Sequence, residues 1–211
     1  GVPVARNEYD DAGRFTAVVD ANGCRTEFHH STSNSTEVVI DRLGHTNIFA
    51  YDLRGNVTAT TNALGGITTM GYDDANNKTR EVAYLGGQPY ATNRWAYTDE
   101  GFLLWHTDPL QQTVSFVYNR YGQVTNSVDA RGYGTTNYYD SAGNLAGTVD
   151  ELNHSTTNVY NDRGLLAWSR DAVGTVTTNS YDELGNLTGS AVLAGSGGSI
   201  LSTNSFEHDA N

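Results

Sequence analysis

The chain has 211 residues, and its 24 acidic and 12 basic side chains give a formal net charge of −12. This acidic balance argues against nucleic acid and anionic membranes as partners. The single cysteine excludes an internal disulfide, and no apolar run is long enough to predict a membrane span. With 23 glycines, 13 tyrosines and only 3 prolines, the composition favours strands and tight turns over helices.

A Tyr-x-x-x-Gly motif recurs along the chain, mostly at steps of 21 residues, and such self-similarity predicts a repeat architecture. We name its tyrosines the tyrosine column: Tyr9, Tyr51, Tyr72, Tyr97, Tyr118, Tyr139, Tyr160 and Tyr181. The glycines that follow form the glycine column: Gly13, Gly55, Gly101, Gly122, Gly143, Gly164 and Gly185. A further copy is expected to have His30 in the tyrosine place and Asn34 in the glycine place, and a last copy begins at His208.

A second turn signal follows the tyrosines, as in "DARG" at Asp129 and "DAVG" at Asp171. A D-x-x-G sequence favours a type I turn followed by a left-handed glycine, which closes a tight hairpin. Each repeat is therefore predicted to hold two turns and two short alternating strands, with no helical periodicity. The predicted fold class is all-β: an antiparallel meander of hairpins in a curled or spiralling sheet strip, without helices.

The turn after Tyr139 predicts that Tyr139 faces Leu145 and that Asn137 faces Gly147. One face of the sheet, the tyrosine face, is expected to carry the tyrosine column and most apolar side chains. The residues assigned to it are Phe15, Val19, Phe28, Ile40, Phe49, Val57, Met70, Trp95, Leu103, Trp105, Phe116, Val124, Val128, Leu145, Val149, Leu166, Trp168 and Leu187. The opposite face is expected to carry small polar residues: Thr58, Thr125, Thr136, Thr157, Thr178 and Thr188.

A repeat of 21 residues conflicts with the period of 2 in a strand, because the columns would change face at each copy. One turn must therefore contain an extra residue, in a longer loop or a bulge. We expect it at the D-x-x-G turn eleven residues after each tyrosine, and we expect longer loops near 84–90 and 193–200. Residues 1–211 are interpreted as a single array of about nine repeats and as a fragment of a longer chain.

Recurring acidic turn residues are the first candidates for chemistry: Asp20, Asp41, Asp108, Asp129, Asp150 and Asp171. Stacked carboxylates can bind Ca²⁺ weakly, but the favoured interpretation is that each aspartate bonds its own turn backbone. His30 and His208 are expected to pack as aromatic rings, and Cys24 has no phased base beside it. We therefore predict no catalytic residue, no cofactor, no metal and no enzyme activity.

Two polar or aromatic sets on the tyrosine face remain. Trp95, Trp105 and Trp168 are candidate glycan contacts, for which packing in the sheet is the alternative. Asparagines replace earlier Phe and Met residues two positions before the later tyrosines, which predicts wetter surroundings toward the C-terminal half. These asparagines are Asn137, Asn158 and Asn179.

The lines "YDLRGNVTATTNALGGITTMGYD" (51–73) and "YDSAGNLAGTVDELNHSTTNVYN" (139–161) resemble YD repeats, also called RHS repeats. The resemblance extends from Tyr9 to Asn211. It implies a strip of β-hairpins that spirals into a hollow shell, as in bacterial RHS toxins, the cocoon of insecticidal toxin complexes and the teneurins. The closing segment of that family, similar to DPxGxxDGxNxYxY, has no counterpart in the sequence.

The resemblance implies a structural role, as part of the wall of a shell that encapsulates or displays a toxin or effector domain encoded elsewhere. The alternative is an extracellular repeat module that binds glycans or a cell-surface partner. Expected partners are the remainder of a longer polypeptide and an enclosed effector, and open terminal strands predict edge-to-edge self-association. The family also implies a secreted or cell-surface bacterial protein.

Overall fold

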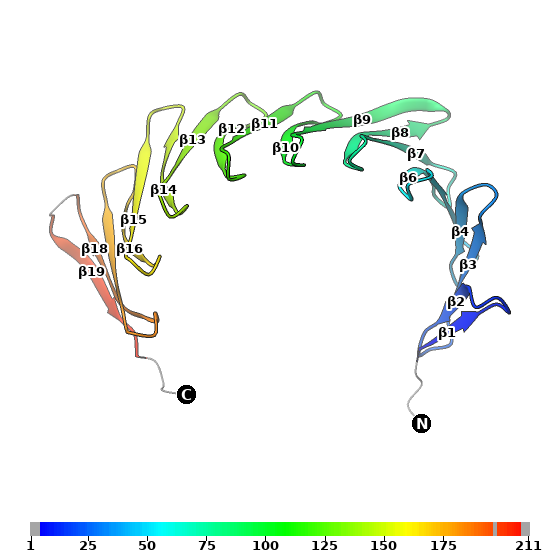
Figure 1. Cartoon of the computed structure of the whole chain (residues 1–211), viewed down its shortest axis with the longest axis horizontal. Coiled ribbons are helices and arrows are strands. Elements are labelled where there is room, and N and C mark those ends of the chain that lie inside the picture. The colour runs from blue at the N-terminus through cyan, green and yellow to red at the C-terminus, as the bar shows by residue number, and fades with distance from the viewer. Residues whose placement is uncertain (1–4, 196–197, 208–211) are drawn as a thin grey trace. The chain divides into compact units, whose positions relative to one another are not determined.

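The computed structural model describes residues 5–195 and 198–207, and all regular structure in these ranges is β-strand. His208 lies outside the described residues. The chain divides into two compact units, Gly1–Thr113 and Val114–Asn211, and the repeat pattern continues in both. The helix-free, antiparallel hairpin fold is confirmed (Figure 1). No helix that could cross a membrane occurs in these ranges.

The first unit is a meander in which each strand pairs antiparallel with the next (Figure 1). Its strands are β1 (Arg6–Tyr9), β2 (Phe15–Val19), β3 (Arg25–Ser31), β4 (Thr36–Ile40), β5 (Thr46–Tyr51), β6 (Val57–Thr61), β7 (Ile67–Tyr72), β8 (Lys78–Leu85), β9 (Gln88–Tyr97) and β10 (Leu103–Thr107). Each strand is short, because a tight turn follows after five to ten residues in most repeats.

The second unit repeats the same arrangement. Its strands are β11 (Thr113–Tyr118), β12 (Val124–Val128), β13 (Gly134–Tyr139), β14 (Leu145–Asp150), β15 (Ser155–Tyr160), β16 (Leu166–Arg170), β17 (Val176–Tyr181), β18 (Leu187–Leu193) and β19 (Ile200–Ser205). In most repeats, one turn follows a tyrosine and is called the tyrosine-side turn. The other follows the second strand of the hairpin and is called the far-side turn.

Both kinds of turn have the same geometry. After β13, the Asp140 N–H donates to the Asn144 carbonyl at 2.9 Å, and the Gly143 N–H donates to the Asp140 carbonyl at 3.1 Å. Gly143 has φ 89°, in the left-handed region that glycine tolerates without strain. The far-side turn at Asp129 has the same two bonds, and Gly132 has φ 88°. The predicted three-residue hairpin loop is therefore confirmed at both ends of the strands.

The extra residue lies beside the tyrosine and not at the far-side turn, so that prediction was wrong. Tyr139 pairs with Leu145 as predicted, but Tyr138 pairs with Gly147, and Ala146 bulges out of β14. The far-side pairs between β12 and β13 run without a shift. Because the bulge adds one residue to the tyrosine-side hairpin, 21 residues return each column to the same face. For the same reason Asn137 pairs with Thr148, not with Gly147 as predicted.

The bulge also changes which face several residues occupy. Residues that lie beyond it on the second strand of a hairpin are shifted by one position. Trp168 pairs with Val159, and Trp105 pairs with Ala96, so both tryptophans lie on the face opposite the tyrosines. The register likewise places Val19, Val128 and Val149 on that opposite face. The assignment of these residues to the tyrosine face was wrong, because it assumed unbroken alternation.

The hairpin of β3 and β4 differs from the others. Ser31 pairs with Thr36 without a bulge, so the loop contains four residues. The left-handed residue is Ser35, with φ 49°, and not Asn34 as predicted. Ile40 pairs with Glu27, which places it on the face opposite Phe28, again against expectation. In this longer loop the Ser35 carbonyl accepts a hydrogen bond from the Tyr51 N–H at 2.8 Å.

The insertion near 84–90 lengthens the strands and not the loop. β8 and β9 have 8 and 10 residues, and Leu85 pairs with Gln88 around a two-residue turn. Gly86 and Gly87 have φ of 57° and 80°, which suits the turn type that matches strand twist in two-residue hairpins. Between β18 and β19, the Ala194 N–H donates to the Ser199 carbonyl at 3.1 Å.

Few side chains are fully buried. Among the described residues, the buried apolar ones are Ala17, Val19 and Val82, and all three lie on the face opposite the tyrosines. Each unit is a single layer of sheet, so a conventional core between two layers is missing. Contacts within the layer must therefore hold one hairpin to the next.

Candidate functional site: the seam between hairpins

The candidate site is the line along which each tyrosine-bearing strand meets the preceding hairpin. The backbone ladder between β14 and β15 stops at the pair Gly147 and Thr157, one residue before the bulge. Beyond that point the Leu145 carbonyl accepts the Tyr160 hydroxyl at 3.2 Å and the Asn158 side-chain amide at 3.0 Å. Two side chains thus replace the ladder where the bulge ends it. We call this arrangement a seam bond.

Two other hairpin junctions of the second unit have the same seam bond. The Val124 carbonyl accepts from Tyr139 at 2.8 Å and from Asn137 at 2.9 Å. The Leu166 carbonyl accepts from Tyr181 at 2.9 Å and from Asn179 at 3.0 Å. In all three cases the tyrosine lies 15 residues and the asparagine 13 residues after the acceptor. The fixed spacing shows that the 21-residue period also specifies the joint between repeats.

The first unit forms seam bonds with a single side-chain donor. The Tyr72 hydroxyl donates to the Val57 carbonyl at 2.9 Å, and the Tyr97 hydroxyl donates to the Lys78 carbonyl at 3.1 Å. Met70 and Trp95 occupy the places of the asparagines and have no amide to donate. Burial raises the pKa of Tyr97, which is consistent with a phenol that stays protonated as a donor.

The remaining tyrosines of the column have other surroundings. Tyr9 belongs to the first hairpin, is 58% exposed and contacts the Phe15 ring edge-on at 5.8 Å between centroids. Tyr51 is half-buried. Its pKa is raised mainly by burial and to a smaller extent by the negative charge of the Glu37 carboxylate. Tyr118 is half-buried at the end of β11. The column is therefore a shared position whose hydroxyl is used differently from repeat to repeat.

The bulge itself is closed by a threonine in several repeats. Thr58, Thr79 and Thr125 each donate their hydroxyl to the carbonyl of the residue before the tyrosine, at 3.2–3.3 Å. These hydroxyls compensate backbone groups that the interrupted ladder leaves without a partner. The bulge is thus a hydrogen-bonded part of the repeat, next to the seam bond.

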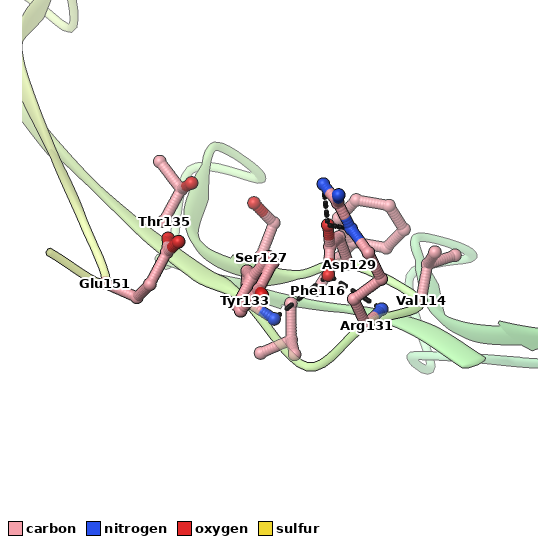
Figure 2. A pocket seen from close by; sticks show the side chains of 9 residues that line it. Val114, Phe116, Ser127, Asp129, Arg131, Tyr133, Thr135 and Glu151 are labelled. Carbon is pink, nitrogen blue, oxygen red and sulfur yellow. Dashed lines mark hydrogen bonds and ion pairs between the residues drawn. The ribbon is translucent and has the colours of Figure 1, made fainter. Parts of the chain in front are cut away.

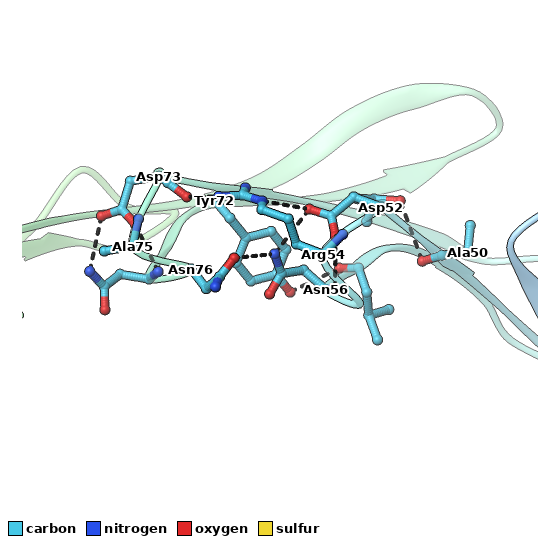
Figure 3. Close-up of polar contacts among 11 residues, drawn as sticks. Ala50, Asp52, Arg54, Asn56, Tyr72, Asp73, Ala75 and Asn76 are labelled. Atoms are coloured by element: carbon cyan, nitrogen blue, oxygen red, sulfur yellow. Dashed lines mark hydrogen bonds and ion pairs between the residues drawn. The ribbon is translucent and has the colours of Figure 1, made fainter.

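The tyrosine-side turns of successive repeats are also tied to each other. Figure 3 shows the Arg54 guanidinium donating to the Asp73 carbonyl at 2.7 Å and the Asn56 amide donating to the Asn76 side chain at 2.8 Å. In the second unit, the Arg163 guanidinium donates to the Glu183 carbonyl at 2.8 Å. These contacts join the tyrosine-side turns of neighbouring repeats.

The acidic turn residues hold their own turns, as predicted. The Asp129 Oδ1 accepts the Arg131 N–H at 2.8 Å and the Tyr133 N–H at 2.9 Å. The same pair of bonds occurs at Asp20, Asp41, Asp108, Asp150 and Asp171. No cluster of three or more His, Cys, Asp or Glu side chains arranged for a metal ion occurs among residues 5–195 and 198–207. Calcium binding stays a prediction.

Aspartates of the tyrosine-side turns have a second bond. The Asn144 amide donates to the Asp140 Oδ2 at 2.9 Å, and this bond, together with backbone N–H donors, lowers the pKa of the Asp140 carboxyl. The Asn186 amide acts in the same way on Asp182 at 2.8 Å. A carboxylate that accepts several hydrogen bonds is stabilised in its charged form. These carboxylates are therefore turn-forming groups with lowered affinity for protons.

One groove on the surface of the second unit is open to solvent and contains a pair of opposite charges. Figure 2 shows a groove of about 340 Å³ in the second unit, lined in part by Phe116, Ser127 and Thr135. At its edge the Arg131 guanidinium pairs with the Asp129 carboxylate at 3.2 Å and lies 4.9 Å from the centre of a tyrosine ring. No buried side-chain nitrogen or oxygen lacks a partner in the described part of the chain.

The candidate aromatic and sulfur groups do not form one site. Trp95 stacks on the His106 ring at 5.0 Å between centroids. The Lys78 ammonium lies 4.7 Å from the centre of the Trp95 ring. Trp105 and Trp168 lie on the face opposite the tyrosines of their own hairpins, so the prediction that all three tryptophans share the tyrosine face was wrong. Cys24 is half-buried and accepts a hydrogen bond from Arg42 at 3.4 Å.

The sequence showed the asparagine column but not its partners. Asn137, Asn158 and Asn179 are half-buried and point their amides at a main-chain carbonyl, which sequence alone did not predict. The available signal was their fixed distance of two residues before a tyrosine. Whether their surroundings are wetter than those of the earlier repeats stays a prediction.

A single-layer meander whose repeats are joined by side-chain donors defines a tandem β-hairpin repeat protein. The family model of the RHS repeat matches residues 51–88, which span two tyrosines of the column and the seam bond between them. Residues 51–88 therefore match an RHS repeat, in agreement with the resemblance found in the sequence. A search of curated proteins finds no match.

Solved structures with the same fold include the TcdB2-TccC3 complex. The crystal structure of TcdB2-TccC3 without its hypervariable C-terminal region has a TM-score of 0.57 and 15% identity, covering 89% of this chain and 14% of that chain. The TcdB2-TccC3-Cdc42 crystal structure has a TM-score of 0.50 and 14% identity, covering 97% and 17%. At these identities the likeness shows the fold, and this chain spans about a sixth or less of the solved chains.

Proposed function

We propose that this chain is a wall segment of a hollow β-shell that encapsulates or displays a toxin or effector domain encoded elsewhere in a longer polypeptide. The observation that supports this role is the seam bond. At three junctions of the second unit, a tyrosine of one repeat donates to a carbonyl of the preceding repeat, so a strip of such repeats can extend without a central core. A thin, continuous wall is the structure that enclosure requires.

The chemistry of the surface supports a structural and not a catalytic role. Acidic side chains at the turns, such as Asp129, accept backbone hydrogen bonds, and in the groove of Figure 2 the Arg131 guanidinium pairs with the Asp129 carboxylate. These charged groups already form hydrogen bonds and ion pairs that stabilise the turns. We also propose that the protein is bacterial and is secreted or lies at the cell surface. Its partners would be the rest of the polypeptide and the enclosed domain.

Limited proteolysis of the full-length polypeptide tests enclosure. The domain encoded beyond the repeats should resist protease in the unmodified protein, and a variant with Asn158→Ala and Tyr160→Phe should expose it faster. Tyr138→Phe is the matched control, because Tyr138 is 55% exposed and lies one residue before the column. Digestion of that domain at the rate of the isolated domain in every protein would contradict encapsulation.

A glycan-binding module is the competing function, and the arrangement of the tryptophans does not favour it. Trp95 and Trp105 lie on opposite faces of the same hairpin, and the Trp95 ring already contacts His106 and Lys78. A glycan array should therefore show no specific binding. Specific binding that Trp95→Ala or Trp105→Ala abolishes would replace the structural proposal.

A further inference from the structure

Two exposed arginines lie directly opposite each other on neighbouring strands of the first unit. Arg80 on β8 pairs with Arg94 on β9, and the register places both side chains on the face that also carries Val82. Residues directly opposite in an antiparallel pair have Cβ atoms about 4.5–5.5 Å apart, and like charges in such a pair are destabilising. The chain places this unfavourable pair together although it has 24 acidic and only 12 basic side chains.

Neither guanidinium is neutralised by an acidic side chain. In the part of the chain that the structure describes, no carboxylate forms an ion pair with Arg80 or Arg94. The acids nearest in sequence have other partners. Glu81 pairs with Lys78 on the tyrosine face at 2.6 Å, and Asp108 accepts two N–H groups of its own turn. The two positive charges therefore face solvent together.

Packing explains the aliphatic stems of the two arginines but not their charged ends. Val82 follows Arg80 by two residues on the same face and is 0% exposed, and Arg94 lies diagonal to it across the hairpin. Arginine stems cover apolar neighbours in this way while the guanidinium stays in water. A methionine in either place would also cover Val82, without placing two like charges side by side.

Small side chains flank the pair on both sides. Arg80 pairs with Gly71 on β7, and Arg94 pairs with Thr107 on β10, so the row across four strands contains no acid. Because Gly71 has no side chain, the outer side of Arg80 stays uncovered. The Thr107 hydroxyl, 2.7 Å from the hydroxyl of Thr113, lies at the other end of the row. The row thus presents two guanidiniums with open space beside them and a hydroxyl nearby.

We propose that Arg80 and Arg94 form a binding site for a single phosphate group, held between the two guanidiniums. A guanidinium presents planar pairs of N–H donors that match phosphate oxygens. A phosphate monoester carries a charge of about −1.5 to −2 near pH 7, so one phosphate neutralises both arginines. The net charge of −12 disfavours an extended polyanion, which leaves free phosphate or a small phosphate ester as the ligand. The site goes beyond the proposed wall function and holds whether or not the chain encloses an effector.

Thermal unfolding of the full chain tests the site, with inorganic phosphate as the probe. Replacing chloride by about 50 mM phosphate at constant ionic strength should raise the midpoint temperature by about 2–4 °C, because the ligand binds the folded chain. Arg94→Met keeps an apolar stem beside Val82 and removes one charge. This variant should lose most of the rise.

Arg170→Met is the matched control. Arg170 is exposed on the face opposite the tyrosines in the second unit, but its cross-strand partners are Thr157 and Val176 and not a second arginine. The control should keep the full rise, since phosphate as a solute stabilises any folded chain equally in all three proteins. Equal rises in the unmodified protein, Arg94→Met and Arg170→Met would overturn the proposal.

The same variants measure the cost of the pair without a ligand. At low ionic strength and without phosphate, Arg94→Met should unfold about 1–2 °C higher than the unmodified protein, because the repulsion between the two guanidiniums is removed. A lower midpoint would contradict the argument that the two charges are unfavourable unless an anion lies between them.

A further measurement does not depend on the stability of a variant. In NMR spectra of the unmodified chain, the side-chain Nε–H signals of Arg80 and Arg94 should shift together as inorganic phosphate is added. O-phosphoserine should cause the same shifts if small phosphate esters bind, and serine should cause none. Signals of Arg80 and Arg94 that move no more than that of Arg170 would overturn the site.

Discussion

The two units close the same joint in different ways. In the second unit a carbonyl such as that of Leu145 receives two side-chain donors, Tyr160 and Asn158. In the first unit the Val57 carbonyl receives only Tyr72, and Met70 occupies the asparagine position. The residue two places before the tyrosine therefore decides whether a seam is closed by polar contacts alone or by a polar contact beside an apolar side chain.

Aromatic contacts take the place of the second donor in parts of the first unit. The rings of Phe15 and Phe28 lie 4.9 Å apart between centroids, and Trp95 stacks on His106. Such ring contacts favour offset or edge-to-face packing, whereas two donors on one carbonyl fix the position of that carbonyl. Within this chain the tyrosine position recurs, while the acceptor spacing and the neighbouring side chain vary between repeats.

A substitution that forces two strands apart at a two-donor seam should lower the free energy of unfolding the most. A Cβ added at Gly147 would lie 2.5 Å from the backbone oxygen of Thr156, so Gly147→Ala must push β14 and β15 apart. We expect a loss of about 2–3 kcal/mol in the free energy of unfolding, measured by chemical denaturation.

Gly189→Ala is the matched control for that change. Gly189 has the same place in its hairpin, but its added Cβ would lie 3.6 Å from the nearest atom, the Asn204 backbone oxygen. Its cost should stay below about 1 kcal/mol. Equal costs at the two glycines would show that strand spacing at the seam does not limit stability.

Removing one hydroxyl should distinguish the two kinds of seam. Tyr72→Phe leaves the Val57 carbonyl without its side-chain donor, and we expect a cost of about 1–2 kcal/mol. Tyr160→Phe leaves Asn158 on the Leu145 carbonyl, and we expect about 0.5–1 kcal/mol. Urea unfolding of both variants, with Tyr138→Phe as the exposed control, measures the difference. A larger cost at Tyr160 would reverse the comparison.

Acid should weaken the turns of both units, with a smaller effect. Asparagine amides are the largest cause that lowers the pKa of Asp52, Asp73, Asp140 and Asp182. Since the folded pKa is below the unfolded value, their stabilisation is present above about pH 4 and is lost as the pH falls through the folded value. The midpoint temperature of thermal unfolding should drop as the pH falls from 4.5 to 2.5. Asn144→Leu should make that drop shallower, and an unchanged profile would contradict the assignment.

The local rules of the repeat were predictable from sequence. A D-x-x-G turn needs only its own four residues, so the pairing of Tyr139 with Leu145 and the left-handed Gly143 follow directly. The turns at Gln111 and Asn153 form the same geometry with φ of 64° and 63°, although they lack glycine. Turn chemistry therefore determines both ends of most hairpins, with the β3–β4 and β8–β9 turns as exceptions.

The position of the bulge was not predictable, because its residue varies. Thr58, Ala146 and Ala167 occupy it in different hairpins and share no turn signal. Because the bulge was not predicted, Trp105, Trp168 and three valines were assigned to the wrong face. These valines are Val19, Val128 and Val149. The carbonyls that accept from the asparagines could not be predicted from sequence for a related reason. Such a carbonyl is available to a side chain only where the bulge ends the backbone ladder. That relation joins residues 13 apart and exists only in the folded sheet.

A double-mutant cycle on Asn158 and Tyr160 tests the central claim that two side chains share one carbonyl. Each single change, Asn158→Ala or Tyr160→Phe, leaves the Leu145 carbonyl with a donor, whereas the double variant leaves it with none. The double variant should therefore lose at least about 0.5 kcal/mol more stability than the two single variants together. Strictly additive losses would contradict the shared seam bond.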